Sequence, residues 1–153
     1  MKGPVLNQSS TYLTYQKSRF STRLPKNRVY TAAHFWIQEV DGRQRVGLTK
    51  FATRMLGDLV ETGFEVKSGG SVSVGEVIGW IEGLKAASDL FCVVNGSFYA
   101  ENPELNENPE WLHKDPYEKG WLYEATGSPE PNATDAQGYT ELLDEIIKKM
   151  TGE

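Results

Sequence analysis

The segment from Leu59 to Ala100 constrains the fold more than any other part of the chain. Short runs of β-branched and aromatic residues alternate there with the glycines that break them. These runs cover residues 59–66, 72–74, 77–81 and 90–94, with turn signals at Ser68-Gly69-Gly70 and Asn95-Gly96 and a further strand expected over 97–100. Evenly spaced short strands separated by glycine turns indicate a β-sandwich or a barrel. We therefore expect a mostly β fold.

The residues before this segment predict a hairpin followed by one short helix. Residues 29–40 are rich in aromatic and branched side chains, Asp41-Gly42 is a strong hairpin turn signal, and residues 46–48 form the expected return strand. Thr49 has the side chain of a helix N-cap, and apolar residues recur at helical spacing until Gly57, which is placed to end the helix. A helix thus interrupts the succession of strands.

The C-terminal part of the chain predicts a return to the sheet, a linker and a helix. A short helix or turn is expected over 103–112, residues 120–125 close the sheet, and residues 126–138 form a linker rich in Gly, Ser, Pro and Asn. The predicted amphipathic helix covers residues 139–150, and its apolar stripe consists of Tyr139, Leu142, Leu143, Ile146, Ile147 and Met150. The stripe has to bury against either the body of the same chain or a partner.

The charges are distributed unevenly along the chain. Residues 1–30 contain six bases and no acid, which leaves ten bases against all 21 acids in the remainder. Residues 1–28 are therefore interpreted as a basic N-terminal extension, which either folds against the acidic body or, from its composition, is a mitochondrial transit peptide. Nucleic-acid binding is disfavoured for so acidic a body, because the neutralisation of phosphates requires clustered Lys and Arg.

The residue inventory disfavours several other classes of protein. The single Cys92 rules out an intramolecular disulfide, and its apolar surroundings predict a buried, inert thiol. One cysteine and two distant histidines cannot by themselves form a standard zinc site. No apolar run is long enough to cross a bilayer. We expect a protein that binds no metal and no membrane and resides in the cytoplasm, with the mitochondrial matrix as the alternative.

A single lysine lies at the centre of the most informative segment, residues 76–94. Two apolar runs, 77–81 and 90–94, flank a small and polar centre that contains Lys85. Lys85 is therefore expected to project from the end of a hairpin. Taken alone, a lysine in such a turn is an ordinary solvated side chain. A functional role for it depends on the wider pattern of residues.

The residues around Lys85 resemble the lipoylation site of the glycine cleavage H-protein family. The usual family pattern is Glu-Ser-Val-Lys-Ala followed by Ser-Asp-Leu, and this chain has Glu82-Gly83-Leu84-Lys85-Ala86 followed by Ser88-Asp89-Leu90. Further matches at the family's internal spacing are Val46-Gly47-Leu48-Thr49, Ala52, Leu56-Gly57-Asp58, Asn102, Leu105, Pro109, Leu112, Asp115-Pro116-Tyr117 and Gly120-Trp121-Leu122. The resemblance covers roughly residues 29–125.

This resemblance implies the fold and the cofactor of the family. The fold is the hammerhead, a barrel-sandwich hybrid lipoyl domain over residues 29–125 with short helices, and the cofactor is lipoic acid amide-linked to Lys85. The long stem of the lysine would act as a flexible tether that concentrates the bound group at a docked partner. The resemblance also implies a carrier with no enzymatic activity of its own. Its partners would include a lipoate ligase or lipoyl-assembly enzymes and dihydrolipoamide dehydrogenase.

Three other side chains are candidates for the same cofactor site. Glu82 and Asp89 flank the lysine, and we interpret them either as determinants of ligase recognition and partner docking or as acids that only solubilise the turn. His34 occupies the position of the histidine in the family's His-Glu-Trp motif, and it resembles a residue that lines the groove sheltering the loaded arm. Its alternative is a partly buried strand residue. His113 is assigned no role.

Departures from the family pattern bear on the pathway that the carrier serves. Phe35 replaces the acid of the His-Glu-Trp motif, Gly83-Leu84 replaces Ser-Val, and Glu118 replaces the glycine after Asp-Pro-Tyr. The change at Phe35 removes a carboxylate that would suit an amine in the groove. The pattern therefore favours the H-protein-like lipoate-binding proteins of sulfur oxidation, whose partner is a heterodisulfide-reductase-like complex.

Two other functions are consistent with the same residues. The first is an H protein of the glycine cleavage system, which carries the aminomethyl group between glycine decarboxylase and aminomethyltransferase. The second is a non-lipoylated H-like binding module. A stand-alone enzyme is disfavoured because the sequence has no credible acid/base or nucleophile set around Lys85.

Overall fold

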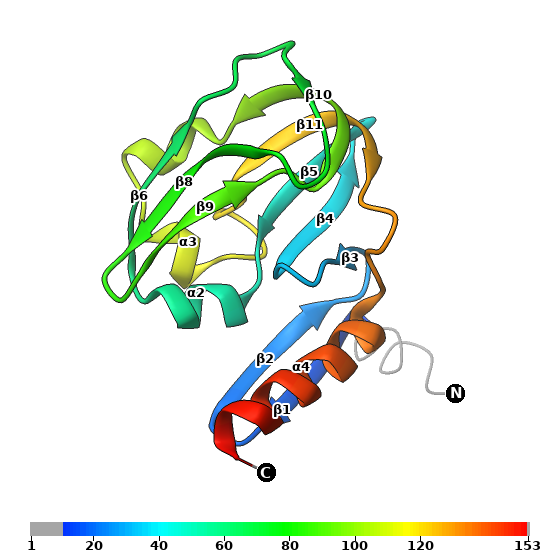
Figure 1. Ribbon diagram of the computed structural model, residues 1–153, viewed down its shortest axis with the longest axis vertical. Helices are drawn as coiled ribbons and strands as arrows, with labels where there is room; N and C mark the ends of the chain where they lie inside the picture. The colour runs from blue at the N-terminus through cyan, green and yellow to red at the C-terminus, as the bar shows by residue number, and fades with distance from the viewer. Residues whose placement is uncertain (1–10, 153) are drawn as a thin grey trace.

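The computed structural model describes residues 11–152, which fold into a β-sandwich with a smaller lobe beside it (Figure 1). The strands are β1 (Tyr12–Lys17), β2 (Phe20–Pro25), β3 (Val29–Tyr30), β4 (Phe35–Val40), β5 (Arg43–Leu48), β6 (Leu59–Phe64), β7 (Ser71–Val72), β8 (Val77–Gly83), β9 (Ala87–Phe91), β10 (Val94–Glu101) and β11 (Tyr123–Pro129). The helices are α2 (Lys50–Leu56), the 3-10 helix η1 (Pro103–Asn106), α3 (Trp111–Lys114) and α4 (Ala136–Thr151). The prediction of a mostly β fold with short helices and a C-terminal helix is confirmed.

Two antiparallel sheets form the sandwich. The larger has the strand order β3-β4-β5-β11-β10-β7, and the smaller has the order β6-β8-β9. Their facing sides enclose a continuous apolar core with buried side chains from both sheets, among them Val46, Ile81, Leu90 and Tyr123. The buried Cys92 belongs to this core, and burial raises the pKa of its thiol. The smaller sheet is therefore held by the packed core on one side, and the loops that connect its strands extend from this core.

The helix between β5 and β6 begins and ends where the sequence predicts. The Thr49 side chain caps the N-terminus of α2 by accepting from the Ala52 amide at 3.4 Å, and Gly57 at the C-terminus has a φ of 80°. The turn before β5 also follows the prediction, because Asp41 and Gly42 both adopt positive φ angles. That backbone suits the twist of a two-residue hairpin.

The prediction of a hairpin turn at Asn95-Gly96 is wrong. Both residues lie inside the continuous strand β10, where Gly96 pairs with Gly127 on one side and with Val72 on the other. A Cβ at Gly96 would lie 1.9 Å from the Thr126 carbonyl oxygen, so the glycine serves a close approach of two strands. The Asn95 side chain instead accepts from the Val74 amide at 2.9 Å. Asn95 and Gly96 are therefore explained by contacts between neighbouring strands and not by a turn.

The segment expected to be a linker is shorter than residues 126–138. Strand β11 continues through Pro129 because its residues pair with β10 as far as Val94. Helix α4 then begins at Ala136, where the Asp135 side chain caps it by accepting from the Gly138 amide at 2.9 Å. The predicted helix start at residue 139 is therefore late by one turn, because this cap precedes the apolar stripe.

The described part of the basic extension folds into the hairpin of β1 and β2, which packs on α4 (Figure 1). We call β1, β2 and α4 the terminal lobe. A second apolar cluster joins this lobe to the sandwich, and it consists of Tyr15, Phe20, Leu24, Tyr30, Trp36, Phe51, Ala136, Tyr139, Leu143 and Ile147. The stripe of α4 thus buries against the chain's own body, except for Met150 near the end of the helix, which was predicted to belong to the stripe but is 58% exposed. The transit-peptide interpretation falls partly on residues 1–10, which lie outside the described residues.

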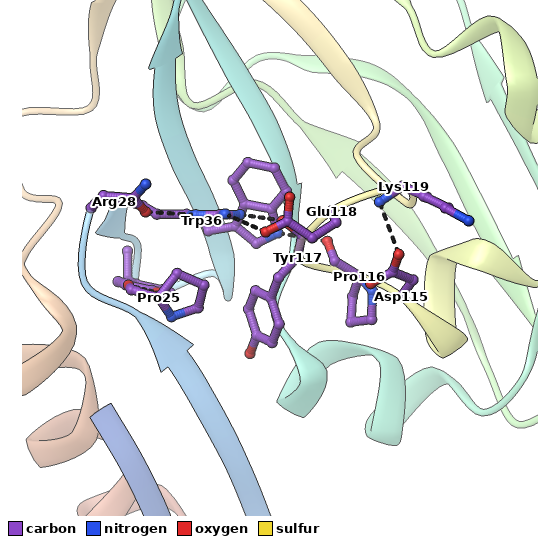
Figure 2. Close-up of polar contacts among 10 residues, drawn as sticks. Pro25, Arg28, Trp36, Asp115, Pro116, Tyr117, Glu118 and Lys119 are labelled. Atoms are coloured by element: carbon purple, nitrogen blue, oxygen red, sulfur yellow. Dashed lines mark hydrogen bonds and ion pairs between the residues drawn. The ribbon is translucent and has the colours of Figure 1, made fainter. Parts of the chain in front are cut away.

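Arg28 fixes the junction between the terminal lobe and the sandwich (Figure 2). Its guanidinium carbon lies 4.4 Å from the ring centroid of Trp36, and it forms a 3.1 Å ion pair with Glu118. The same guanidinium donates to the Tyr117 carbonyl oxygen, and the Trp36 indole donates to the Pro116 carbonyl oxygen at 2.9 Å. Glu118, which departs from the family pattern, therefore pairs with a residue of the extension.

Candidate functional site

Lys85 lies at the tip of the β8–β9 hairpin, as the sequence predicts. The tip consists of Leu84, Lys85 and Ala86, and the Gly83 amide closes it by donating to the Ala86 carbonyl oxygen at 2.9 Å. All three tip side chains are exposed. Figure 1 shows the hairpin projecting from the sandwich beside α2. The lysine is thus presented to solvent from the edge of a packed sheet.

The C-terminal end of α2 holds the backbone of this tip. The Leu56 carbonyl oxygen accepts from the Lys85 amide at 2.9 Å and from the Ala86 amide at 3.3 Å, while the Leu84 amide donates to the Asp58 carbonyl oxygen at 3.0 Å. Carbonyl groups at the end of a helix lack partners within the helix, and the hairpin supplies one here. The backbone of Lys85 is fixed in this way, whereas its side chain stays exposed.

Among the described residues, the Lys85 side chain has one hydrogen-bond partner, and that bond is weak. Its Nζ donates to the Arg54 carbonyl oxygen at 3.3 Å, and this bond is exposed to solvent. An open pocket beside it is lined by Lys50, Thr53, Arg54, Gly57, Asp58, Leu84, Lys85 and His113. The amine can therefore leave its position at small cost, since an exposed hydrogen bond of this length competes with water.

Gly57 allows the hairpin to approach α2. Its φ is 80°, and a Cβ there would lie 2.8 Å from Lys85 Cγ and 3.0 Å from the Lys85 amide nitrogen. A methyl group would meet both the backbone strain of a positive φ and the lysine itself. Gly69 offers a comparison, because its φ is 88° and a Cβ there would meet nothing within 4 Å.

We expect Gly57→Ala to displace the hairpin tip and Gly69→Ala to leave it in place. Each variant should lose about 1 to 2 kcal/mol of stability from the left-handed backbone, and Gly57→Ala should lose more because of the collision. Urea unfolding measures the stabilities, and amide chemical shifts of residues 84–86 report the tip. Equal stabilities together with unchanged shifts in Gly57→Ala would contradict the close approach described here.

The structure separates the two flanking acids. Asp89 on β9 lines a small, mostly apolar pocket together with His34, Phe35, Met55 and Phe91. Glu82 on β8 is exposed and lines neither this pocket nor the one beside Lys85. Asp89 is therefore placed to meet a group that enters the apolar pocket, whereas the position of Glu82 suits contact with a docking protein.

His34 is partly buried at the edge of the apolar pocket and has an unusual backbone. Its φ is 72°, a left-handed conformation that is uncommon for a residue other than glycine. Two hydrogen bonds hold it there, from its amide to the Thr31 carbonyl oxygen and from the Thr49 amide to its own carbonyl oxygen, both at 3.0 Å. Burial lowers the pKa of the imidazole to about 4, so the ring is neutral at pH 7.

Two residues near the site were not predicted from the sequence. Tyr139 on α4 places its hydroxyl 2.8 Å from His34 Nδ1 and 2.7 Å from Thr49 Oγ1. His113, to which we assigned no role, accepts from the Leu59 amide at 3.0 Å through its Nδ1 and so fixes the start of β6. The helical stripe indicates that Tyr139 is buried, but no local pattern indicates its partner more than a hundred residues away.

Comparisons with known proteins agree with this geometry. The family model described as glycine cleavage H-protein matches residues 28–146. The glycine cleavage system H protein of Bacteroides fragilis is 40% identical over 122 residues, which is 78% of this chain and 96% of that protein. That of Kocuria rhizophila is 40% identical over 128 residues, covering 80% of this chain and 99% of its own length.

A solved structure shows the same fold. The crystal structure of a glycine cleavage system H protein from Mycobacterium marinum matches with a TM-score of 0.72 and 34% identity, over 79% of this chain and 99% of the other. The family match continues past residue 125 into α4, further than the sequence motifs indicated. These relatives favour the glycine cleavage alternative over the sulfur-oxidation interpretation, which they do not support. The chain belongs to the glycine cleavage H-protein family.

Proposed function

We propose that this chain is a lipoyl carrier of the glycine cleavage system and that lipoic acid is amide-linked to Lys85. H proteins are carriers and have no enzymatic activity of their own. The observation that carries the proposal is the position of Lys85, an exposed lysine at the tip of a hairpin whose backbone is bonded to the end of α2. A carrier needs this combination of a rigid base and a mobile side chain, because one arm has to reach several active sites.

The residues present fit the cofactor. Lys85 provides a primary amine whose single tie, to the Arg54 carbonyl oxygen at 3.3 Å, is exposed and easily given up. Amide formation removes the positive charge of the amine, and no carboxylate pairs with Nζ among the described residues, so no ion pair is lost. When bound, the lipoyl group supplies a dithiolane that undergoes exchange with nucleophiles at its sulfur atoms.

The protein's own residues present and shelter the arm. The β8–β9 hairpin sets where the tether begins, and the end of α2 keeps that point fixed. The mostly apolar pocket of His34, Phe35 and Asp89 lies between α2, β4 and β9, close to the same hairpin, and offers the arm a place out of water. We propose glycine decarboxylase, aminomethyltransferase, dihydrolipoamide dehydrogenase and a lipoate ligase as partners, and the cytoplasm as the location. No helix within residues 11–152 combines the length and the apolar character needed to span a membrane.

The lipoylated protein is expected to support glycine decarboxylase at a rate comparable to that of an established H protein. The measurement follows the exchange of labelled carbon dioxide into the carboxyl group of glycine, with the unlipoylated chain as the matched control. Activity that depends on lipoylation supports the proposal. Background exchange by a fully lipoylated sample would contradict the assignment to this pathway, while leaving the modification of Lys85 intact.

One observation favours a second candidate function. Phe35 is only 3% exposed and lines the pocket where the family pattern has an acid, so the pocket lacks a carboxylate at that position. The phenylalanine side chain at this position suits a sulfur adduct, and it leaves Asp89 as the one carboxylate in the pocket lining that could pair with an ammonium group. The sulfur-oxidation function requires productive turnover with a heterodisulfide-reductase-like complex. Assaying the same lipoylated sample with that complex and with glycine decarboxylase separates the two functions.

A further inference from the structure

Three side chains form a hydrogen-bonded series that connects α4, α2 and the apolar pocket beside the β8–β9 hairpin. Thr49 Oγ1, the Tyr139 hydroxyl and His34 Nδ1 follow one another at 2.7 Å and 2.8 Å. Thr49 and Tyr139 are fully buried, and the ring of Phe51 packs against His34 with a centroid distance of 4.8 Å. Tyr139 comes from α4, Thr49 is the N-cap of α2 and His34 directly precedes β4, so the arrangement is set by tertiary packing.

The number of donors and acceptors determines which atom donates in each of these two hydrogen bonds. Thr49 Oγ1 accepts from the Ala52 amide, and its own hydroxyl proton has one acceptor among the described residues, the Tyr139 oxygen. Burial raises the pKa of Tyr139, so the phenol keeps its proton and donates it to the remaining neighbour, His34 Nδ1. A nitrogen that accepts carries no proton. The neutral imidazole therefore carries its single proton on Nε2.

We propose that Tyr139 is a positioning residue that holds His34 as the neutral Nε2–H tautomer, which gives the apolar pocket a hydrogen-bond donor for the lipoyl arm. His34 lines that pocket, and its Nε2 has no hydrogen-bond partner among residues 11–152. The group recognised is an acceptor on the arm or its cargo, such as the carbonyl oxygen of the lipoyl-lysine amide. The role of the arm rests on the proposed function, whereas the tautomer does not.

The surroundings of His34 are consistent with an imidazole held as a hydrogen-bond donor for a bound group. Its left-handed backbone costs free energy, which the rest of the fold has to offset, and strain of this kind concentrates at binding sites. Asp89 from β9 is the one formally charged side chain that shares the pocket lining. The aromatic rings of Tyr139 from α4 and Phe51 from α2 also lie against the imidazole. Without its own hydrogen-bond chain, the ring would have no fixed tautomer.

The tautomer can be measured directly by nitrogen-15 NMR of the imidazole rings in the full chain. The chain has two histidines, and His113 is an internal reference because its Nδ1 accepts from the Leu59 amide. We expect His34 in the wild type to have an unprotonated Nδ1 and a protonated Nε2 down to about pH 5, since its pKa is lowered to about 4. A protonated Nδ1 in the neutral wild-type ring would overturn the proposal.

Two matched variants test the role of the tyrosine. Tyr139→Phe should give His34 a mixture of tautomers and leave His113 unchanged. Tyr15→Phe, which removes the hydroxyl that donates to Asp144 in the same lobe, should leave both histidines unchanged. An unaltered His34 tautomer in folded Tyr139→Phe would overturn the proposal. The wild-type measurement alone decides the matter if that variant does not fold.

A second readout concerns the arm itself. In the lipoylated and reduced protein, alkylation of the arm's thiols by iodoacetamide reports how often the arm leaves the pocket. Tyr139→Phe should raise this rate by about two-fold, because a ring divided between its two tautomers presents the Nε2 proton only about half of the time, and Tyr15→Phe should not. Equal rates combined with the expected tautomers would overturn the donor role of His34. A chain that cannot be lipoylated at Lys85 would instead refute the proposed function and leave the tautomer result standing.

Discussion

The Lys85→Arg variant is expected to fold like the wild type and to have no carrier activity. Arginine keeps the positive charge but has no primary amine that a ligase can acylate. The fold should tolerate the change, because the Lys85 side chain is exposed and, among the described residues, hydrogen-bonds only to the Arg54 carbonyl oxygen. The expected effect is the loss of glycine exchange and of lipoamide-dependent electron transfer to background.

Lys50→Arg is the matched control for this prediction. Lys50 is an exposed lysine that lines the same pocket as Lys85, so the substitution repeats the chemistry a short distance from the hairpin. This control should be lipoylated and active, with the thermal transition of the wild type. Residual activity of Lys85→Arg above background would show that another residue carries the group. An equal loss in Lys50→Arg would show that the pocket, and not the amine, is the sensitive feature.

Leu143→Ala is expected to destabilise the protein strongly. Leu143 is fully buried in the second apolar cluster, between α4 and the β1–β2 hairpin. Removing its side chain leaves a cavity, which costs about 2 to 5 kcal/mol for a leucine in a well-packed core. For a chain of this length, that loss lowers Tm by roughly 5 to 15 °C.

Met150→Ala serves as the control on the same helix. Met150 was predicted to belong to the apolar stripe, but it is 58% exposed in the structure, so its removal should change stability by no more than about 0.5 kcal/mol. Calorimetry of both variants provides the comparison. A Leu143→Ala transition within 2 °C of the wild type would contradict the packing of α4 described here, with about 2 °C being the shift expected from less than 1 kcal/mol.

The reason for this sensitivity is that the lobe shares side chains with the sandwich. Trp36 on β4 and Phe51 on α2 belong to the sandwich and its helix, yet both pack into the cluster that α4 completes. Arg28 adds the ion pair with Glu118 at the same junction. Damage to α4 should therefore reach His34 and the N-terminus of α2 through Tyr139.

Local sequence patterns predict the features of the site that depend on neighbouring residues. The N-cap at Thr49, the helix end at Gly57 and the hairpin that carries Lys85 each follow from a few consecutive side chains with strong conformational preferences. A helix cap or a hairpin turn depends on only a few consecutive residues, so the local sequence is enough to predict it.

Features that depend on distant residues could not be predicted in the same way. Asn95-Gly96 has the composition of a turn, but the close approach of β11 at Gly127 requires the glycine within a strand. The bond between Tyr139 and His34 joins residues more than a hundred positions apart, and periodicity shows only that Tyr139 is buried. The single substitution at Phe35 was also not enough to predict the pathway. Its apolar side chain indicated a sulfur cargo, whereas the relatives indicate glycine cleavage.

Mapping the modification is the most direct test of whether Lys85 carries the lipoyl group. The full chain is incubated with lipoate, ATP and a lipoate ligase, digested, and analysed by peptide mass spectrometry beside an established H protein. We predict a single lipoyl adduct, on the peptide that contains Lys85. An adduct on any other lysine, or an unmodified chain under conditions in which the established H protein is fully lipoylated, would contradict it.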